Sequence, residues 1–406
     1  MTIPQDKGFI PLDEDAEDEI PESECIPPDS QEEPELLDHQ FSPDVARIVG
    51  TNDTSGLAIQ RDDLLTSILT TFETIRQQVQ EGRLPVTDAA HRILDITNHV
   101  GDPELIRQSQ IVIQAIIDHT QLPTVTLTSS HQLDQARLTA RSLLLNGEII
   151  PAIQALQTEV DKQDTLFSGI GRTVPRYFNS YAERVVYNRL FKADDETTVL
   201  IPDSLFYAHM EIGMLLVKTG NPQEGIAHLN KAVAYAPSYP LVHLQQSIQF
   251  ALIQDWSSAQ AACLNALRVA YDYDDAAYAY YRYAYAAWML GHFDRAAAAY
   301  ILSDAIHPNG IPALAHEYKE LLDRAASQRI SLPQTVSEAI NILIDADIPI
   351  WPHTEVATII RQASRAMVDE GLFVPARTLA LATARMDTRA GKPDAIQTQF
   401  LRSMTF

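Results

Sequence analysis

A repeat of about 34 residues runs through residues 204–308 and limits the possible folds more than any other property of this sequence. Each of its three units holds two stretches in which apolar residues recur every three or four positions, as in amphipathic helices. Short turns at Gly220, Gln254–Asp255 and Gly291 join the two stretches of each unit. Small residues recur at three matching positions of the units: Gly213, Gly225 and Ala232; Ser247, Ala259 and Ala266; Ala284, Ala296 and Ser303. Because small side chains let paired helices cross closely, the repeat predicts closely packed helix pairs.

This pattern resembles the tetratricopeptide repeat (TPR) unit, and the resemblance implies an all-α fold. The expected architecture is a TPR-like right-handed α-solenoid of antiparallel helix pairs. Two weaker copies, "DQARLTARSLLLNGEIIPAIQALQTEV" and "ATIIRQASRAMVDEGLFVPARTLALATARM", flank the repeat and are expected to form divergent or capping pairs. The whole chain is also similar to uncharacterised bacterial TPR proteins in which a helix like "YFNSYAERVVYNRLF" precedes the central repeats. That similarity implies no known activity.

Four regions are predicted along the chain. They are a disordered acidic tail (1–56), a divergent helical region (57–200), the core repeats (201–310) and a C-terminal capping region (311–406). Residues 1–45 hold fifteen acidic residues against the single Lys7, which gives −14 of the chain's net charge of −24. Such a composition buries too little apolar surface to order itself. The tail is either a solubilising extension or a linear motif, in which Leu36, Leu37 and Phe41 dock on a partner or on this chain's own groove.

The balance of charge argues against nucleic-acid and anionic-membrane partners, because both require clustered Lys and Arg. The chain begins without a basic segment followed by an apolar one, and it contains no run of about 18 apolar residues. We therefore expect a soluble, cytoplasmic protein.

Seven of the fifteen tyrosines lie within residues 271–288, "YDYDDAAYAYYRYAYAAW". The TPR resemblance implies that the second, fifth, ninth and twelfth positions of each first helix line a concave surface. These positions hold Tyr207, Met210, Met214 and Val217; Leu241, Leu244, Ile248 and Ala251; Tyr278, Tyr281, Tyr285 and Trp288. Tyr280 and Tyr283 should instead pack between helices, and Arg282 and Lys218 are the nearest cations. Tyrosine suits a binding surface because it buries a large area at low entropic cost. Two interpretations stay open: an accessible ligand groove, or a surface filled by this chain's own segments.

Motifs for catalysis and metal binding are incomplete in this sequence. The stretch "HEYKE" at 316–320 has Glu320 where a zinc helix needs its second histidine. "SGIGRT" at 168–173 lacks the glycines and lysine of nucleotide-binding loops, and "DYDD" at 272–275 lacks the glycine and glutamate of a calcium loop. Cys263 lies at a packing position and should be inert. His209 and His243 occupy equivalent repeat positions, which packing explains. The prediction is no enzyme, no cofactor and no metal.

The expected function is that of a non-catalytic scaffold that binds a protein or peptide through an apolar, Tyr-rich concave groove. The alternative is a TPR sensor that responds to a small peptide. The sequence argues against a carboxylate clamp for chaperone tails, since Met210 and Met214 replace the required Lys and Asn. The predicted binding residues are Tyr207, Met210, Met214, Leu244, Tyr278, Tyr281, Arg282, Tyr285 and Trp288.

Overall fold

The computed structural model describes residues 40–122, 128–169 and 171–386, all of which belong to one compact unit. Within these residues the chain forms seventeen α-helices, one 3₁₀ helix and a sheet of two short strands. The predicted all-α fold class is therefore confirmed. No helix among the described residues combines the length and the apolar character needed to cross a membrane.

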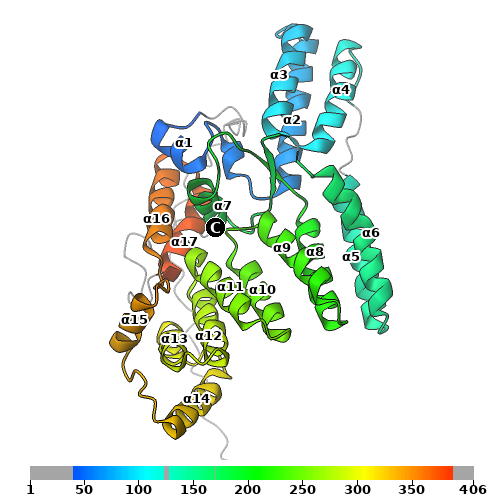
Figure 1. Ribbon diagram of the computed structural model, residues 1–406. Helices are drawn as coiled ribbons and strands as arrows, with labels where there is room; N and C mark the ends of the chain where they lie inside the picture. Colours follow the sequence, from blue (N-terminus) through cyan, green and yellow to red (C-terminus); the bar gives the residue numbers. More distant parts are fainter. Residues whose placement is uncertain (1–39, 123–127, 170, 387–406) are drawn as a thin grey trace, which may run out of the picture. The chain divides into compact units, whose positions relative to one another are not determined.

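The predicted core repeat forms three consecutive helical hairpins (Figure 1). Their helices are α8 (Asp203–Lys218) and α9 (Pro222–Tyr235), α10 (Pro240–Leu252) and α11 (Trp256–Val269), and α12 (Tyr273–Met289) and α13 (Phe293–Ile306). The turns contain Gly220, Gln254 and Gly291, which all have positive φ, as the left-handed helix ends require. The first helices of successive hairpins also contact each other, α8 with α10 and α10 with α12.

Close helix crossing explains the small residues of the repeat, and all nine positions are buried. The approach is tightest in the first hairpin, where Gly213 of α8 faces Gly225 of α9. A Cβ atom on Gly225 would lie 2.7 Å from the Gly213 carbonyl oxygen and 2.8 Å from a Val217 methyl carbon. In the other two hairpins Ala259 and Ala296 fill the corresponding positions, so those pairs leave room for one methyl group.

Both weaker copies of the repeat also form helical hairpins. The first comprises α5 (Thr128–Leu145) and α6 (Ile149–Leu166), and the second comprises α16 (Thr354–Asp369) and α17 (Phe373–Met386). Gly147 and Gly371 have positive φ in their turns. Helices α14 (Leu314–Gln328) and α15 (Val336–Asp345) connect the core repeat to the second of these hairpins.

Three N-terminal helices, α2 (Arg61–Gln80), α3 (Val86–Val100) and α4 (Pro103–Ile117), share an apolar cluster. A buried ion network joins α2 to the start of α4. The Arg61 guanidinium donates to Asp102 Oδ2 at 2.6 Å and to Glu104 Oε2 at 2.8 Å. Asp102 also caps α4 by accepting from the backbone amides of Glu104 and Leu105.

The segment "YFNSYAERVVYNRLF" (177–191) contains helix α7 (Tyr181–Leu190), which connects two strands that the sequence did not predict. Strands β1 (Thr173–Arg176) and β2 (Thr197–Leu200) pair in parallel on either side of this helix. Both strands lie in or at the end of the region 57–200 that was predicted to be helical, because four-residue strands give no usable alternation of apolar and polar residues. Helix α7 begins at Ser180, whose hydroxyl accepts from the Glu183 amide. Residues 182–188 are all buried, and α7 contacts α1, α16 and α17.

The predicted tail boundary at residue 56 is wrong for residues 40–56. These residues form α1 (Pro43–Val49) and a 3₁₀ helix, η1 (Thr54–Leu57). Phe41, Val45 and Val49 are buried, and α1 contacts α7 and α16. Val45 and Val49 are four residues apart and so lie on one face of α1, a signal that the surrounding acidic residues obscured, and Phe41 precedes the helix. Phe41 thus packs against this chain itself, whereas Leu36 and Leu37 of the proposed motif lie outside the described residues.

Candidate functional site

The predicted binding positions differ in exposure according to their place in the first helix. The second and ninth positions are partly exposed in all three hairpins: Tyr207 and Met214, Leu241 and Ile248, Tyr278 and Tyr285. The fifth position is buried in all three, since Met210, Leu244 and Tyr281 are only 5%, 2% and 7% exposed. Because residues seven apart lie on one face of a helix, the second and ninth positions form a stripe on each first helix. We call these three stripes the first-helix face.

Helix α14 covers part of the predicted wall in the third hairpin. The Tyr281 hydroxyl donates to Glu317 Oε1 at 2.8 Å, and the Tyr300 hydroxyl donates to Glu317 Oε2 at 2.9 Å. Burial and the neighbouring Glu317 carboxylate raise the pKa of Tyr281. Trp288 is also buried. At these positions the chain fills its own surface, as the second of the two interpretations supposed.

The chain also contacts Tyr207 in the first hairpin. Its hydroxyl lies 3.1 Å from the Tyr177 hydroxyl, and the Arg137 guanidinium carbon lies 5.2 Å from the centre of its ring. Arg137 is held there by an ion pair with Glu211, at 2.7 Å. Tyr207 therefore has partners on α5 and before α7, although part of its side chain stays exposed.

Arg282 lies between Tyr278 and Tyr285, the two residues that α12 contributes to the first-helix face. They are partly exposed and occupy neighbouring turns of α12, at spacings of four and three residues. The Tyr285 ring makes edge contacts with Trp256 at 5.7 Å and with Trp288 at 6.1 Å. These contacts fix the ring while leaving part of it accessible. Arg282 Nε has no hydrogen-bond partner among the described residues.

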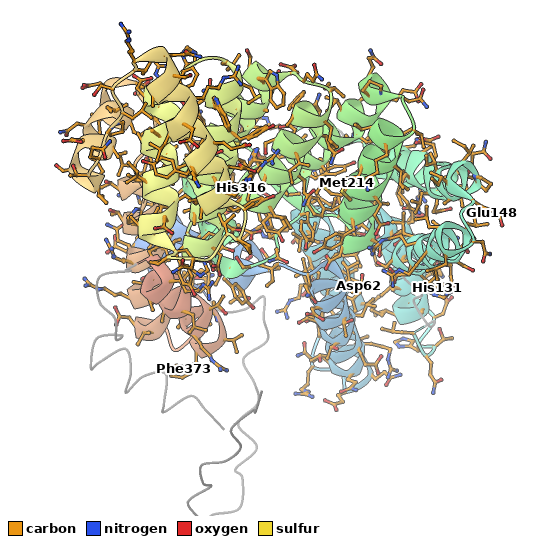
Figure 2. The ribbon with its side chains drawn as sticks, turned by 90° about the horizontal axis from the view of Figure 1, so that it is seen from below. Asp62, His131, Glu148, Met214, His316 and Phe373 are labelled. Atoms are coloured by element: carbon orange, nitrogen blue, oxygen red, sulfur yellow. The ribbon has the colours of Figure 1, made fainter. Side chains whose placement is uncertain are left out.

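Figure 2 labels Met214, one of the predicted binding residues, and His316, which begins the incomplete zinc motif. Met214 is on α8 and is a partly exposed member of the first-helix face. His316 is on α14 and begins the "HEYKE" stretch; its side chain is exposed. The described residues contain no group of three or more His, Cys, Asp or Glu side chains that could hold a metal ion.

The two repeat histidines have hydrogen-bond partners in the packed interior. His209 is 3.0 Å from His228, between their Nδ1 atoms, and its Nε2 atom is 3.1 Å from Asp164 Oδ1. His243 Nε2 is 2.9 Å from the Pro237 carbonyl oxygen. Cys263 is fully buried, and burial raises the pKa of its thiol to about 11, so it is a weak nucleophile.

Helix α7 carries two buried charged groups that sequence reasoning did not single out. Glu183 accepts from the Asn179 amide at 2.7 Å and from the Tyr271 hydroxyl at 2.9 Å. Burial raises the pKa of Glu183 to about 8. Its neighbour Arg184 is buried too. An adjacent Glu and Arg within "AERVV", a segment that is otherwise apolar, was the available signal.

Comparison with known proteins gives no family for this chain. No protein-family model matches the sequence, and no curated protein matches it. Eight chains of solved structures match. One of them comes from a study entitled "Functional Characterization of Pseudomonas Aeruginosa pilF"; it is 13% identical, and the match covers 68% of this chain and 99% of that chain, with a TM-score of 0.33. A likeness at that TM-score supports no argument about fold or function. The helical hairpins are established by the structure of this chain, and its resemblance to TPR units rests on the repeat pattern of its sequence.

Proposed function

We propose that this protein is a non-catalytic scaffold that binds a peptide segment of a protein partner on the first-helix face. The observation that carries the proposal is the repetition of exposure. The same two positions stay partly exposed in three successive hairpins, and all six residues there are Tyr, Leu, Ile or Met of large apolar area, with the three tyrosines supplying hydroxyls as well. The repeated packing of the hairpins accounts for the repeated exposure, but it does not require a large apolar side chain at every one of these positions.

The spacing of these side chains suits a helical peptide. Residues seven apart on a helix are separated by about 10 Å along its axis, and neighbouring helices pack about 8–10 Å apart. The first-helix face is therefore a grid of apolar anchors with a spacing of about 10 Å. An amphipathic peptide helix presents apolar residues at i, i+3, i+4 and i+7, so its repeat matches this grid.

The experiment is a selection of displayed peptides against the full chain, followed by calorimetric measurement of their affinities. Tyr278→Ser/Tyr285→Ser should weaken binding of the selected peptides at least tenfold, because buried tyrosines often contribute more than 1 kcal/mol each. The matched control is Leu145→Ser/Val374→Ser, which removes two exposed apolar side chains of α5 and α17. Equal affinity for the folded tyrosine variant and the wild type would refute the proposal.

The size of the ligand separates the scaffold from the sensor. A sensor would be stabilised by a short peptide alone, whereas a scaffold would need the peptide within a larger partner for full affinity. The sensor function also requires the hairpins to move, which would strain the hydrogen bonds from Tyr281 and Tyr300 to Glu317. Those contacts favour the scaffold.

A further inference from the structure

A cavity of about 130 Å³ lies beside helix α7, away from the first-helix face. It is lined by residues of α2, α3, α7 and β2, of the segment 51–55 and of the loop that precedes β2. Leu64, Val100 and Leu200 are its buried apolar lining. The volume is roughly ten times what a single water molecule requires. We call it the α7 cavity.

Arg184 lines the α7 cavity with an incompletely paired charge. The residue is 3% exposed, its Nε donates to the Gly56 carbonyl at 2.7 Å, and its guanidinium lies 4.6 Å from the centre of the Phe178 ring. Among the described residues, its Nη1 has no hydrogen-bond partner, and it forms no ion pair. Burial lowers its pKa to about 10. A buried guanidinium normally faces an anion, and here the protein supplies none in direct contact.

Two further cations line the same cavity. Lys192 Nζ donates to the Gly50 carbonyl at 2.9 Å, and its pKa is lowered by burial and by the nearby charge of Arg184. His99 has an exposed side chain at the rim and is 3.1 Å from Asp53 Oδ2, which raises its pKa. The mutual repulsion of these groups is a cost that an anion between them would remove.

Four hydroxyl groups complete the lining, those of Thr51, Ser55, Thr197 and Thr198. Thr51 and Ser55 donate theirs to Asp53, and Thr198 donates to Glu196, so the Thr197 hydroxyl is the donor left for a ligand. Glu196 is the one carboxylate among the lining residues of this described part; it already accepts from the Tyr187 hydroxyl and, at 3.1 Å, from Thr198. It offsets one positive charge and Asp53 pairs with His99, so the lining keeps the uncompensated charge of one cation.

We propose that the α7 cavity binds a phosphoryl group between Arg184, Lys192 and His99, either as inorganic phosphate or as the end of a phosphomonoester. A phosphoryl group carries up to two negative charges and accepts hydrogen bonds on three or four oxygens. A carboxylate offers only two oxygens, too few for the cations and the Thr197 hydroxyl, which approach from several elements. Bound there, the phosphoryl group would join α7 to the 50–56 segment, whose carbonyls Arg184 and Lys192 already contact.

The test is calorimetric titration of the full chain with sodium phosphate and with phosphoserine at constant ionic strength, since salt alone screens surface charges. Saturable binding of one equivalent is expected for at least one of them, and the tighter of the two identifies the free or the esterified source. Lys192→Met should weaken that binding roughly ten- to a hundredfold. His99→Asn, at the exposed rim, is a second variant that leaves the interior intact. Lys319→Met, an exposed lysine of α14 outside the cavity, should bind like the wild type.

Three results would overturn the proposal. One is the absence of saturable heat with either phosphate compound. Another is unchanged affinity in both folded cavity variants, which would place the anion elsewhere. The third is equal or tighter binding of acetate, which would make the cavity a carboxylate site.

Discussion

Replacement of Glu183 by Gln should raise the stability of the variant relative to the wild type as pH rises. The Glu183 side chain is fully buried, and its pKa is raised to about 8 from an ordinary value of 4.5. Desolvation is the main cause, and the charge of Asp275 adds to it. The folded chain therefore keeps a proton on Glu183 between about pH 4.5 and pH 8, whereas the unfolded chain releases it. The contribution of protonated Glu183 to the stability of the folded chain is therefore complete below pH 4.5 and is lost as pH rises through 8.

The size of the effect follows from the difference between the two pKa values. That difference is about 3.5 units, and at 1.36 kcal/mol per unit it corresponds to about 5 kcal/mol between pH 4.5 and pH 8 and above. Glutamine resembles the protonated carboxyl group in shape and keeps one acceptor and a donor, but it does not titrate. Compared with the wild type, Glu183→Gln should gain several kcal/mol of unfolding free energy between pH 5 and pH 8.5.

Urea denaturation of both chains at pH 5, 6.5 and 8.5 measures this gain, because all other titrations are shared and cancel in the difference. Glu320→Gln, at an exposed position of α14, is the matched control and should show no comparable trend. A difference between Glu183→Gln and the wild type that stays constant with pH would refute the reasoning. It would mean that Glu183 is ionised in the folded protein.

Three further substitutions probe the packing. Gly225→Ala should lower the free energy of unfolding by about 1–3 kcal/mol, because its Cβ atom would lie 2.7 Å from a backbone oxygen of α8. Urea denaturation measures this loss, and Gln223→Ala, at an exposed position, is the control. Tyr281→Phe should lower the unfolding free energy by about 1 kcal/mol through loss of its hydrogen bond to α14, whereas Tyr278→Phe should change it little. Arg61→Met should lower the free energy of unfolding by about 3–5 kcal/mol, since it leaves two carboxylates at the start of α4 without their buried cation. A thermal melt that matched that of the wild type would contradict this expectation.

The parts of the fold that depend on local spacing were predictable from the sequence. The nine small residues of the repeat predicted close helix crossings, and Gly220 and Gly291 predicted turns, because each position allows few other side chains. The self-filled part of the tyrosine wall was left open. Tyr281 is covered by Glu317, and no repeat position indicates which later helix will return to cover the third hairpin.

Two other features depended on contacts distant in sequence. Nothing in the local sequence distinguishes Arg184 from an ordinary helix residue, because the 50–56 segment and β2, which surround it, are distant in sequence. The α7 cavity therefore had no sequence motif. Helix α1 was assigned to the tail because its acidic surroundings outweighed Val45 and Val49 on one of its faces and Phe41 just before it. In both cases tertiary packing decides what local composition leaves open.

Site-specific photo-crosslinking tests the first-helix face most directly. A photoreactive phenylalanine analogue replaces Tyr278 in one sample and Leu145, which is 85% exposed on α5, in another. Each chain is irradiated with the tightest peptide from the selection. If the peptide binds on the first-helix face, we expect a crosslinked peptide from position 278 and none from position 145. A peptide that binds with unchanged affinity but crosslinks only from position 145 would contradict binding on the first-helix face.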